Sequence, residues 1–209
     1  MRTRVKICGI TRSEDAQLAV DAGADAIGLV FYEKSPRFVS NALAAELSQI
    51  IPAFVSRVAL FKDADKQVIE SVLQTVEIDL IQFHGSETVD FCEQFNLPYI
   101  KAIGMKGTEH DNNFLLANVE KYQSAKAILL DGHAPGEAGG TGESFDWASI
   151  ATVAKPIVLA GGLTPENVKQ AIDLVQPFAV DVSSGVESSP GIKDKDKVLA
   201  FMEQVSLRN

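Results

Sequence analysis

The feature that most limits how this chain can fold is the regular alternation of short apolar runs with helical stretches. Eight apolar runs read as buried strands. They lie at residues 5–8, 26–31, 57–61, 78–83, 99–103, 127–130, 157–160 and 178–182. Near-continuous apolar runs are typical of a parallel sheet that helices cover. The strand pattern therefore predicts an α/β protein.

Eight helical stretches follow these runs. Acidic residues in a first turn, a glycine just past a helix end, and the segment Thr164-Pro165-Glu166 are typical helix boundary signals. The predicted helices lie at 13–23, 41–51, 68–73, from about 87, 114–122, 147–153, from 164, and 195–205. Eight units of about 26 residues predict one (β/α)8 TIM barrel domain over residues 1–209. The alternative is an open, doubly wound sheet with additional strands.

Composition and charge limit the partners. A chain of 209 residues, 46% hydrophobic and 22% charged, is long enough for one sizeable core and typical of a soluble globular protein. No apolar run reaches membrane-spanning length, and the N-terminus lacks the apolar core of a signal peptide. A formal charge of -9 argues against nucleic acid and anionic membranes as partners. With only Cys8 and Cys92, no disulfide framework is expected, so the predicted location is cytoplasmic.

In a barrel, functional side chains follow the carboxyl ends of the strands. Asp131 ends the sixth apolar run and precedes a glycine-rich loop, a place typical of a catalytic acid. Cys8 ends the first run, so both side chains could face one pocket across the barrel mouth. A proton transfer between carbon and oxygen needs one group that accepts a proton and another that donates one. Cys8 and Asp131 are the predicted catalytic pair.

Both residues also have a purely structural interpretation. A cysteine at this position is by itself more typical of a core residue, and Asp131 could be a loop cap. As a base, a thiol with a pKa near 8.5 is only about 3% ionised at pH 7, a cost of about 2 kcal/mol. Lys6 lies on the same strand face, so it is placed either beside the thiol or in a pair with Asp181 inside the barrel.

Two loops near the C-terminus are typical of a phosphate site. Gly161-Gly162 and Ser183-Ser184-Gly185 follow the seventh and eighth strands and lead toward short helical starts. Backbone N–H groups there can bind an anion without net positive charge, as an acidic protein requires. Either glycine segment alone could merely form a tight turn. Together, at the two loops where barrels commonly hold phosphate, they favour the phosphate site.

Three further side chains beyond strand ends are predicted to contact a substrate. Arg37 can bind a carboxylate through two parallel hydrogen bonds, although a lone loop arginine is more often solvated surface. Gln82 and His84 stand at the end of the fourth strand. The histidines His84, His110 and His133 lack ligand spacing, so no metal and no cofactor is predicted.

In order, these motifs resemble the phosphoribosylanthranilate isomerase family over essentially the whole chain. Ile10, Phe83 and Glu143 differ from the residues that are frequent in that family at these positions. None of the three is the predicted acid, the predicted base or the arginine predicted to bind a carboxylate. The matching segments are KICGIT (6–11), GLVF (28–31), SPR (35–37), QFHG (82–85), LD (130–131), GGTG (139–142), FDW (145–147), LAGGL (159–163) and VDVSSGVE (180–187).

The resemblance implies a cofactor-free Amadori rearrangement in tryptophan biosynthesis, with a small phosphorylated substrate. N-(5′-phosphoribosyl)anthranilate becomes 1-(2-carboxyphenylamino)-1-deoxyribulose 5-phosphate. By analogy, Asp131 protonates the ribose ring oxygen, Cys8 removes the C2′ proton, and Arg37 holds the anthranilate carboxylate. The glycine and serine loops hold the phosphate, and the loop at 132–143 closes over the site and excludes water.

Other functions are weighed against this one. The related isomerase of histidine biosynthesis pairs two aspartates, so Cys8 argues against it, while activity on both substrates stays open. A catalytically silent phosphate-binding barrel would be favoured by loss of Cys8 or Asp131, and both are present. A metal-dependent epimerase requires His and Asp ligands at strand ends, which the sequence lacks. A monomer is expected, because no strand reads as an exposed apolar edge.

Overall fold

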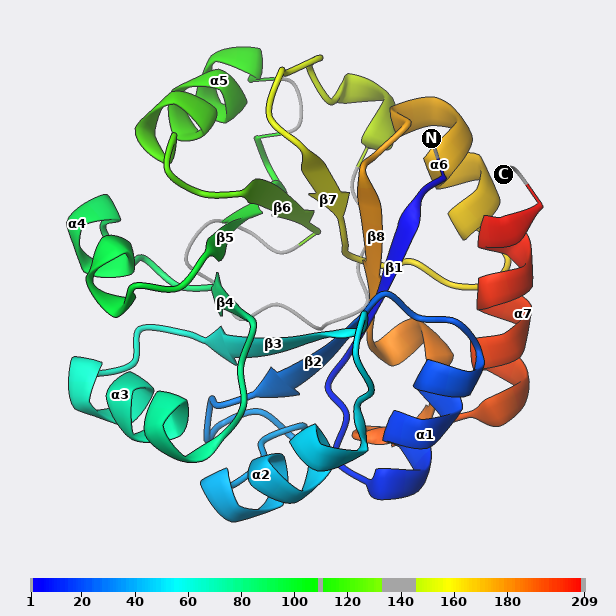
Figure 1. Cartoon of the computed structure of the whole chain (residues 1–209). Helices are drawn as coiled ribbons and strands as arrows, with labels where there is room; N and C mark the ends of the chain where they lie inside the picture. The colour runs from blue at the N-terminus through cyan, green and yellow to red at the C-terminus, as the bar shows by residue number, and fades with distance from the viewer. Residues whose placement is uncertain (1, 109–110, 133–145, 208–209) are drawn as a thin grey trace.

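Eight parallel strands form a closed barrel in the computed structural model, which describes residues 2–108, 111–132 and 146–207. Strands consecutive in the chain are neighbours, and β8 pairs with β1 to close the sheet. Figure 1 shows the helices as an outer ring around these strands. The predicted (β/α)8 barrel is confirmed, and the open doubly wound sheet is excluded. That residues 1–209 form a single domain stays a prediction.

The strand boundaries lie within two residues of those expected from the apolar runs. The strands are β1 (Arg4–Cys8), β2 (Ala26–Val30), β3 (Ser56–Phe61), β4 (Leu80–Phe83), β5 (Tyr99–Gly104), β6 (Ala127–Asp131), β7 (Ile157–Leu159) and β8 (Ala179–Val182). The helices are α1 (Ser13–Asp21), α2 (Asn41–Ile50), α3 (Lys66–Thr75), α4 (Val89–Cys92), α5 (Asn112–Lys121), α6 (Val168–Val175) and α7 (Lys195–Ser206).

Two helix predictions need correction. The stretch predicted at 147–153 contains only a 3-10 turn, η2 (Trp147–Ser149), and the chain is extended at Ile150, so the described residues hold seven α-helices rather than eight. The helix expected from Thr164 begins four residues later. The reason lies in Asn167, whose side chain accepts a hydrogen bond from the Thr164 N–H (2.8 Å) and donates one to the Gly162 carbonyl (2.8 Å). Such local bonds compete with helix formation.

Side-chain alternation along the strands determines which residues reach the barrel interior. On β6, Ile128 and Leu130 join the main core between sheet and helices, whereas Leu129 belongs to a smaller cluster inside the barrel. Asp131 therefore continues the inward-facing series at the carboxyl end of its strand. On β1, Lys6 and Cys8 are likewise two residues apart on one face. The period of the strands thus directs these polar side chains toward the barrel mouth.

A short hairpin that the sequence pattern does not predict follows β8. After a 3-10 turn, η3 (Ser184–Val186), the strands β9 (Glu187–Ser189) and β10 (Ile192–Lys193) pair antiparallel before α7 begins. Glu187 and Lys193 are partners in its register. The hairpin thereby brings these two buried charged residues together.

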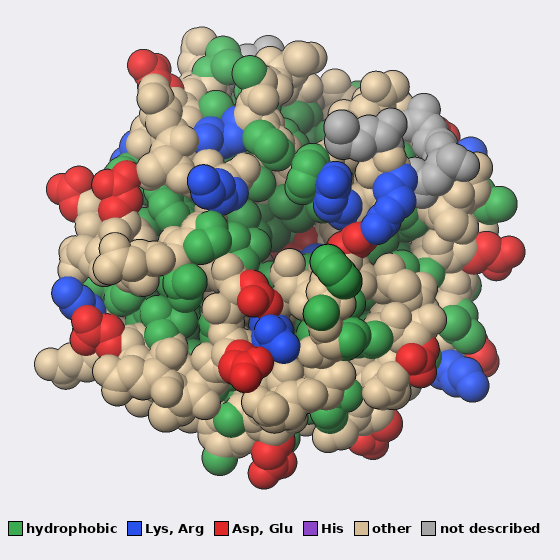
Figure 2. All heavy atoms as spheres, viewed as in Figure 1, with side chains coloured by type: hydrophobic (Ala, Val, Ile, Leu, Met, Phe, Trp, Pro, Cys, Tyr) green, Lys and Arg blue, Asp and Glu red, His purple; other side chains and the backbone are tan. Residues whose placement is uncertain are grey.

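Among the described residues on the face seen in Figure 2, acidic and basic side chains are interspersed without a large area of one sign. Within the described residues, no helix combines the length and apolarity needed to cross a membrane.

Candidate active site

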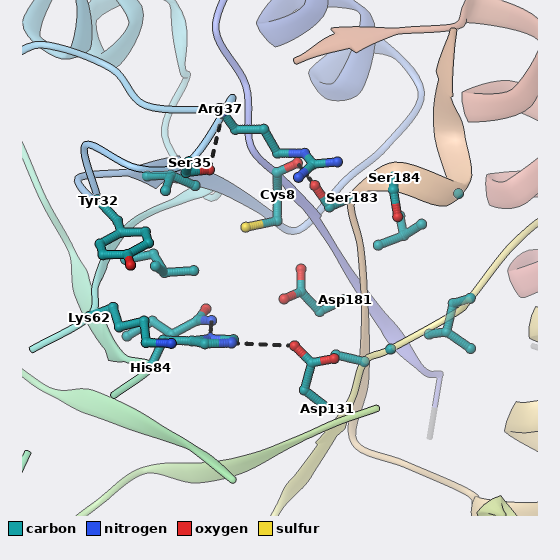
Figure 3. Close-up of a pocket in the computed structure, with 18 of the residues that line it drawn as sticks. Cys8, Tyr32, Ser35, Arg37, Lys62, His84, Asp131, Asp181, Ser183 and Ser184 are labelled. Carbon is teal, nitrogen blue, oxygen red and sulfur yellow. Dashed lines mark hydrogen bonds and ion pairs between the residues drawn. The ribbon is translucent and has the colours of Figure 1, made fainter. Parts of the chain in front are cut away.

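One pocket, with a cavity volume of about 290 Å³, brings together all ten side chains and glycines predicted to form the site. Its wall comes from the carboxyl ends of the strands and the loops that follow them, as the barrel fold requires. The predicted residues in the wall are Cys8, Arg37, Gln82, His84, Asp131, Gly161, Gly162, Ser183, Ser184 and Gly185. Figure 3 shows the labelled side chains arranged around this space.

Cys8 ends β1 with its sulfur directed into the pocket (Figure 3). Its ladder partner on β2 is Gly28, where a Cβ atom would lie 2.7 Å from the sulfur, so only glycine leaves room for the thiol. Burial raises the thiol pKa, and the nearby charge of Lys6 lowers it only in part. The resting thiol is therefore mainly protonated at neutral pH.

Lys6 both forms an ion pair with Asp181 and lies close enough to Cys8 to influence its thiol, so the two predicted placements of Lys6 hold together. Its ammonium nitrogen lies 2.8 Å from Oδ2 of Asp181, and both side chains are buried. Burial lowers the pKa of Lys6, but the charge of Asp181 and the hydrogen bond to its carboxylate outweigh that effect and raise the pKa overall. Lys6 is thus a buried cation that stabilises the Asp181 carboxylate and also favours the thiolate form of Cys8.

Asp131, at the end of β6, contacts His84 after β4. Oδ2 of Asp131 lies 3.3 Å from Nε2 of the imidazole, and Nδ1 lies 2.9 Å from the side-chain nitrogen of Gln82. Because an amide nitrogen only donates, Nδ1 accepts and the ring proton is assigned to Nε2, where it points at Asp131. Gln82 therefore orients His84, and His84 in turn fixes the orientation of the Asp131 carboxyl group. Figure 3 shows the contact between His84 and Asp131.

Asp181 is a pocket residue that the sequence indicated only as a partner for Lys6. Its carboxylate lies between Asp131 and Cys8 in Figure 3. Burial raises its pKa, the charge of Lys6 opposes this, and the nearby Asp131 adds to it. Its Oδ1 atom is buried and accepts no hydrogen bond from the described part of the chain. The inward-facing period of β8 is the signal that could have placed Asp181 in the site.

Arg37 is not the solvated surface residue of the alternative interpretation, because it is only 9% exposed. Its Nε and Nη2 atoms donate to the two carboxylate oxygens of Glu187, at 2.8 and 2.7 Å. This hydrogen-bonded ion pair raises the pKa of Arg37. One edge of the guanidinium is thus already bound within the protein. The sequence did not indicate this partner, because the pair joins the loop after β2 to strand β9, 150 residues apart.

The two phosphate-loop candidates touch each other. A Cβ atom at Gly185 would overlap the Leu163 carbonyl, and one at Gly161 would overlap the Gly132 backbone. Gly161 and Gly162 have φ angles of 80° and 65°, values that favour glycine, so they also form the tight turn of the alternative interpretation. Because α6 begins only at Val168, any anion here is bound by loop N–H groups rather than by that helix N-terminus.

The wall formed by β2, β3 and their loops contains residues that the sequence did not single out. Tyr32, Lys34 and Lys62 line it together with the apolar side chains of Val30 and Leu60. The ammonium nitrogen of Lys62 lies 5.8 Å from the centre of the Tyr32 ring. The rule that functional residues follow strand ends could have identified Lys62, because it comes directly after β3.

Comparison with known proteins decides the family. The family model described as N-(5'phosphoribosyl)anthranilate (PRA) isomerase matches residues 5–204. A protein of Pseudomonas fluorescens strain SBW25, named N-(5'-phosphoribosyl)anthranilate isomerase, is 52% identical over 203 residues, which cover 97% of this chain and 95% of the relative. The chain belongs to the phosphoribosylanthranilate isomerase family.

Solved structures of phosphoribosylanthranilate isomerases agree with this assignment. The Thermotoga maritima protein is 41% identical, covers 98% of both chains and superposes with a TM-score of 0.85. Another member, 38% identical with a TM-score of 0.81 and 98% coverage of both chains, was solved in complex with reduced 1-(o-carboxyphenylamino)-1-deoxyribulose 5-phosphate. The family resemblance and the prediction of an isomerase are therefore confirmed.

The predictions about loop closure and about the histidines concern residues that lie partly outside the described part of the chain. The closure of the loop at 132–143 concerns mainly residues 133–143, which lie outside the described residues, as do His110 and His133. In the parts of the chain that are described, no group of three or more His, Cys, Asp or Glu side chains could hold a metal ion.

Proposed function

We propose that this pocket catalyses the Amadori rearrangement of N-(5′-phosphoribosyl)anthranilate by general acid–base catalysis, as a step of tryptophan biosynthesis. Family membership supports the substrate and the overall reaction. The observation that carries the mechanism is that Cys8 and Asp131, which end β1 and β6, line the same pocket. A thiol and a carboxyl group there supply the two proton-transfer groups that the reaction needs.

Asp131 acts first, as the acid. It gives a proton to the ribose ring oxygen while the bond between C1′ and that oxygen breaks. The lone pair of the anthranilate nitrogen then forms a double bond to C1′, so the product of this step is an open-chain iminium ion. The contact from His84 orients the carboxyl group for the transfer.

Cys8 acts second, as the base. Its thiolate takes the C2′ proton, the electrons of that bond move toward the iminium nitrogen, and an enol forms. The enol becomes the ketone when a proton is delivered to C1′ and the hydroxyl on C2′ loses its proton. Because burial raises the pKa of the Cys8 thiol, the thiolate is scarce but strongly basic, and the charge of Lys6 favours its formation.

The rest of the pocket binds the substrate. The free edge of Arg37 takes the anthranilate carboxylate, and the wall with Tyr32 and Leu60 takes the aromatic ring. The two loops at 161–162 and 183–185 hold the phosphate through backbone N–H groups and serine hydroxyls. Gln82 and His84 complete the wall beside Asp131. The proposed reaction uses no metal and no cofactor.

Turnover of freshly generated phosphoribosylanthranilate, followed by loss of its fluorescence, tests this function. Wild type should turn over, and Cys8→Ser and Asp131→Asn should each lose about 10²-fold or more in kcat while remaining folded. Cys92→Ser is the matched control, because Cys92 is equally buried but belongs to the core and not to the pocket. A silent wild type, or full activity in either site variant, would contradict the proposal. A separate turnover assay with the aminoimidazole substrate of histidine biosynthesis, followed by chromatography of substrate and product, decides whether a second substrate is accepted.

We further propose a cytoplasmic monomer. The two cysteines are free and buried, which suits a reducing compartment. Two observations favour a dimer instead: Phe54 is fully exposed, and the relative from Thermotoga maritima is described as dimeric. Sedimentation velocity should give the mass of one 22.5 kDa chain, and a species of twice that mass would contradict the proposal.

A further inference from the structure

A buried cluster of three charged side chains lies against the pocket: Arg37, Glu187 and Lys193. Oε1 of Glu187 accepts hydrogen bonds from Nε of Arg37 and Nζ of Lys193, both at 2.8 Å. Oε2 accepts one from Nη2 of Arg37, at 2.7 Å. The side chains are 11%, 5% and 0% exposed in the order Arg37, Glu187, Lys193. Of the three, Arg37 alone lines the pocket, so the other two influence a ligand only through their neighbours.

The cluster is hydrogen-bonded to the backbone at two places in the pocket wall, Cys8 and Ser183. Nζ of Lys193 also donates to the carbonyl oxygens of Cys8, at 2.7 Å, and Ser183, at 3.1 Å. These residues stand where β1 ends and where the loop after β8 begins. Glu187 therefore ties the guanidinium of Arg37 to the backbone of the proposed base and to the proposed phosphate loop.

Geometry leaves one edge of the guanidinium for a ligand. The group has five N–H donors, and Glu187 takes one from Nε and one from Nη2. The remaining hydrogens on Nη1 and Nη2 form an end-on pair that matches a carboxylate. Among the described residues, Nη1 has no hydrogen-bond partner. The aliphatic stem of Arg37 lies so close to Gly9 that a Cβ atom there would overlap its Cδ. The stem and one edge of the side chain are thus both held.

We propose that Glu187 is a positioning residue for substrate recognition: it turns Arg37 so that the end-on pair of N–H groups meets the carboxylate of the substrate. The inference rests on the role of Arg37 stated under Proposed function. Without Glu187, the long arginine side chain would have to lose its torsional freedom when the substrate binds. The effect of Glu187 is therefore specific to ligands that carry the carboxyl group.

Two stable ligands test this specificity. The first is 1-(2-carboxyphenylamino)-1-deoxyribitol 5-phosphate, a reduced form of the product, and the second is the same molecule without the carboxyl group. Wild type should bind the carboxylated ligand about 10²-fold more tightly by calorimetry, as expected for a charge-assisted bidentate contact. In Glu187→Gln, this ratio should fall below about 10-fold, because affinity for the first ligand drops while affinity for the second is nearly unchanged.

Further variants keep the inference testable if Glu187→Gln does not fold. Glu187→Asp keeps the charge but is shorter by one methylene group, so it should fold and show the same selective loss. Glu203→Gln removes a carboxylate from the exposed face of α7 and should leave both affinities unchanged. Equal loss for both ligands would mean that Glu187 is only structural, and tighter binding of the carboxylated ligand would mean that Glu187 competes with it. Either result overturns the proposal.

Arg37→Met separates this inference from the function on which it rests. If Arg37→Met keeps the wild-type ratio of affinities, the proposed carboxylate clamp is wrong, and the role of Glu187 is wrong with it. If Arg37→Met abolishes the ratio while Glu187→Gln and Glu187→Asp keep it, the clamp stands and only the positioning role is overturned.

Discussion

At the scale of single residues, the two thiols show how position decides chemistry. Burial raises the pKa of Cys92 to about 12 and also raises that of Cys8, so neither is a ready nucleophile at neutral pH. They differ in what they face. Cys92 packs in the core, whereas the sulfur of Cys8 lines the pocket beside Lys6. In the role of base that we propose for it, Cys8 depends on the charge of Lys6 and on the bound substrate for its proton transfer.

Alkylation measures this difference. Because iodoacetamide reacts with thiolates, native protein at about pH 8 should be modified at Cys8 before Cys92, and at both more slowly than the urea-unfolded chain. Peptide mass spectrometry over time gives the two rates. The reduced product analogue should protect Cys8 and leave Cys92 unchanged. If Cys8 reacted faster in the native protein than in the unfolded chain, the site would lower the pKa of this thiol instead of raising it, and the expectation would be wrong.

At the scale of elements, the strands could be predicted and the irregular connections could not. Near-continuous apolar runs identify the eight strands, and the barrel then places Cys8 and Asp131 at one mouth. The β9–β10 hairpin has strands of three and two residues and no apolar alternation, so the sequence does not signal it. The sequence also does not indicate the hydrogen bonds of Glu187 with Arg37 and Lys193, because tertiary contacts bring these partners together. The late start of α6 likewise depends on the local bonds of Asn167.

The contact between the loops after β7 and β8 leads to a prediction about Gly185. A Cβ atom at Gly185 would overlap the Leu163 carbonyl, and a backbone atom cannot yield as a flexible side chain can. Gly185→Ala should therefore raise KM and destabilise the fold by about 1–3 kcal/mol. Urea unfolding and steady-state kinetics measure the two effects. Gly107→Ala is the control for KM, which should not change, because no atom lies within 4 Å of its Cβ position. It is not a control for stability, because the φ angle of 81° at Gly107 disfavours alanine. An unchanged KM in Gly185→Ala would show that the loop contact does not shape the proposed phosphate site.

At the scale of the whole molecule, the protein and its substrate are both negatively charged and therefore repel each other at long range. The chain carries a formal charge of -9, and the substrate has both a phosphate and a carboxylate. Lys34 and Lys62, which line the pocket, offset this field locally, and Arg37 shares its charge with Glu187. Association is therefore a balance between a repulsive mean field and a few cations at the pocket.

Salt dependence tests that balance. Raising sodium chloride from about 0.01 M to about 0.15 M shortens the screening length from about 30 Å to about 8 Å, which weakens the long-range repulsion more than the contacts in the pocket. We expect kcat/KM to rise modestly over this range. Lys62→Met should lower kcat/KM and make its rise with salt steeper. A steady fall of wild-type kcat/KM with added salt would show instead that the pocket cations dominate association.

The most direct test of the central claim is the isotope effect at C2′, measured in single turnovers of wild type and Cys8→Ser with substrate that carries deuterium at that carbon. If Cys8 removes the C2′ proton, its loss makes that step the slowest one. Cys8→Ser should then be slow and show a larger isotope effect than wild type. If Cys8→Ser is slow but its rate does not depend on the isotope, Cys8 acts in another step and the assignment of the base is wrong.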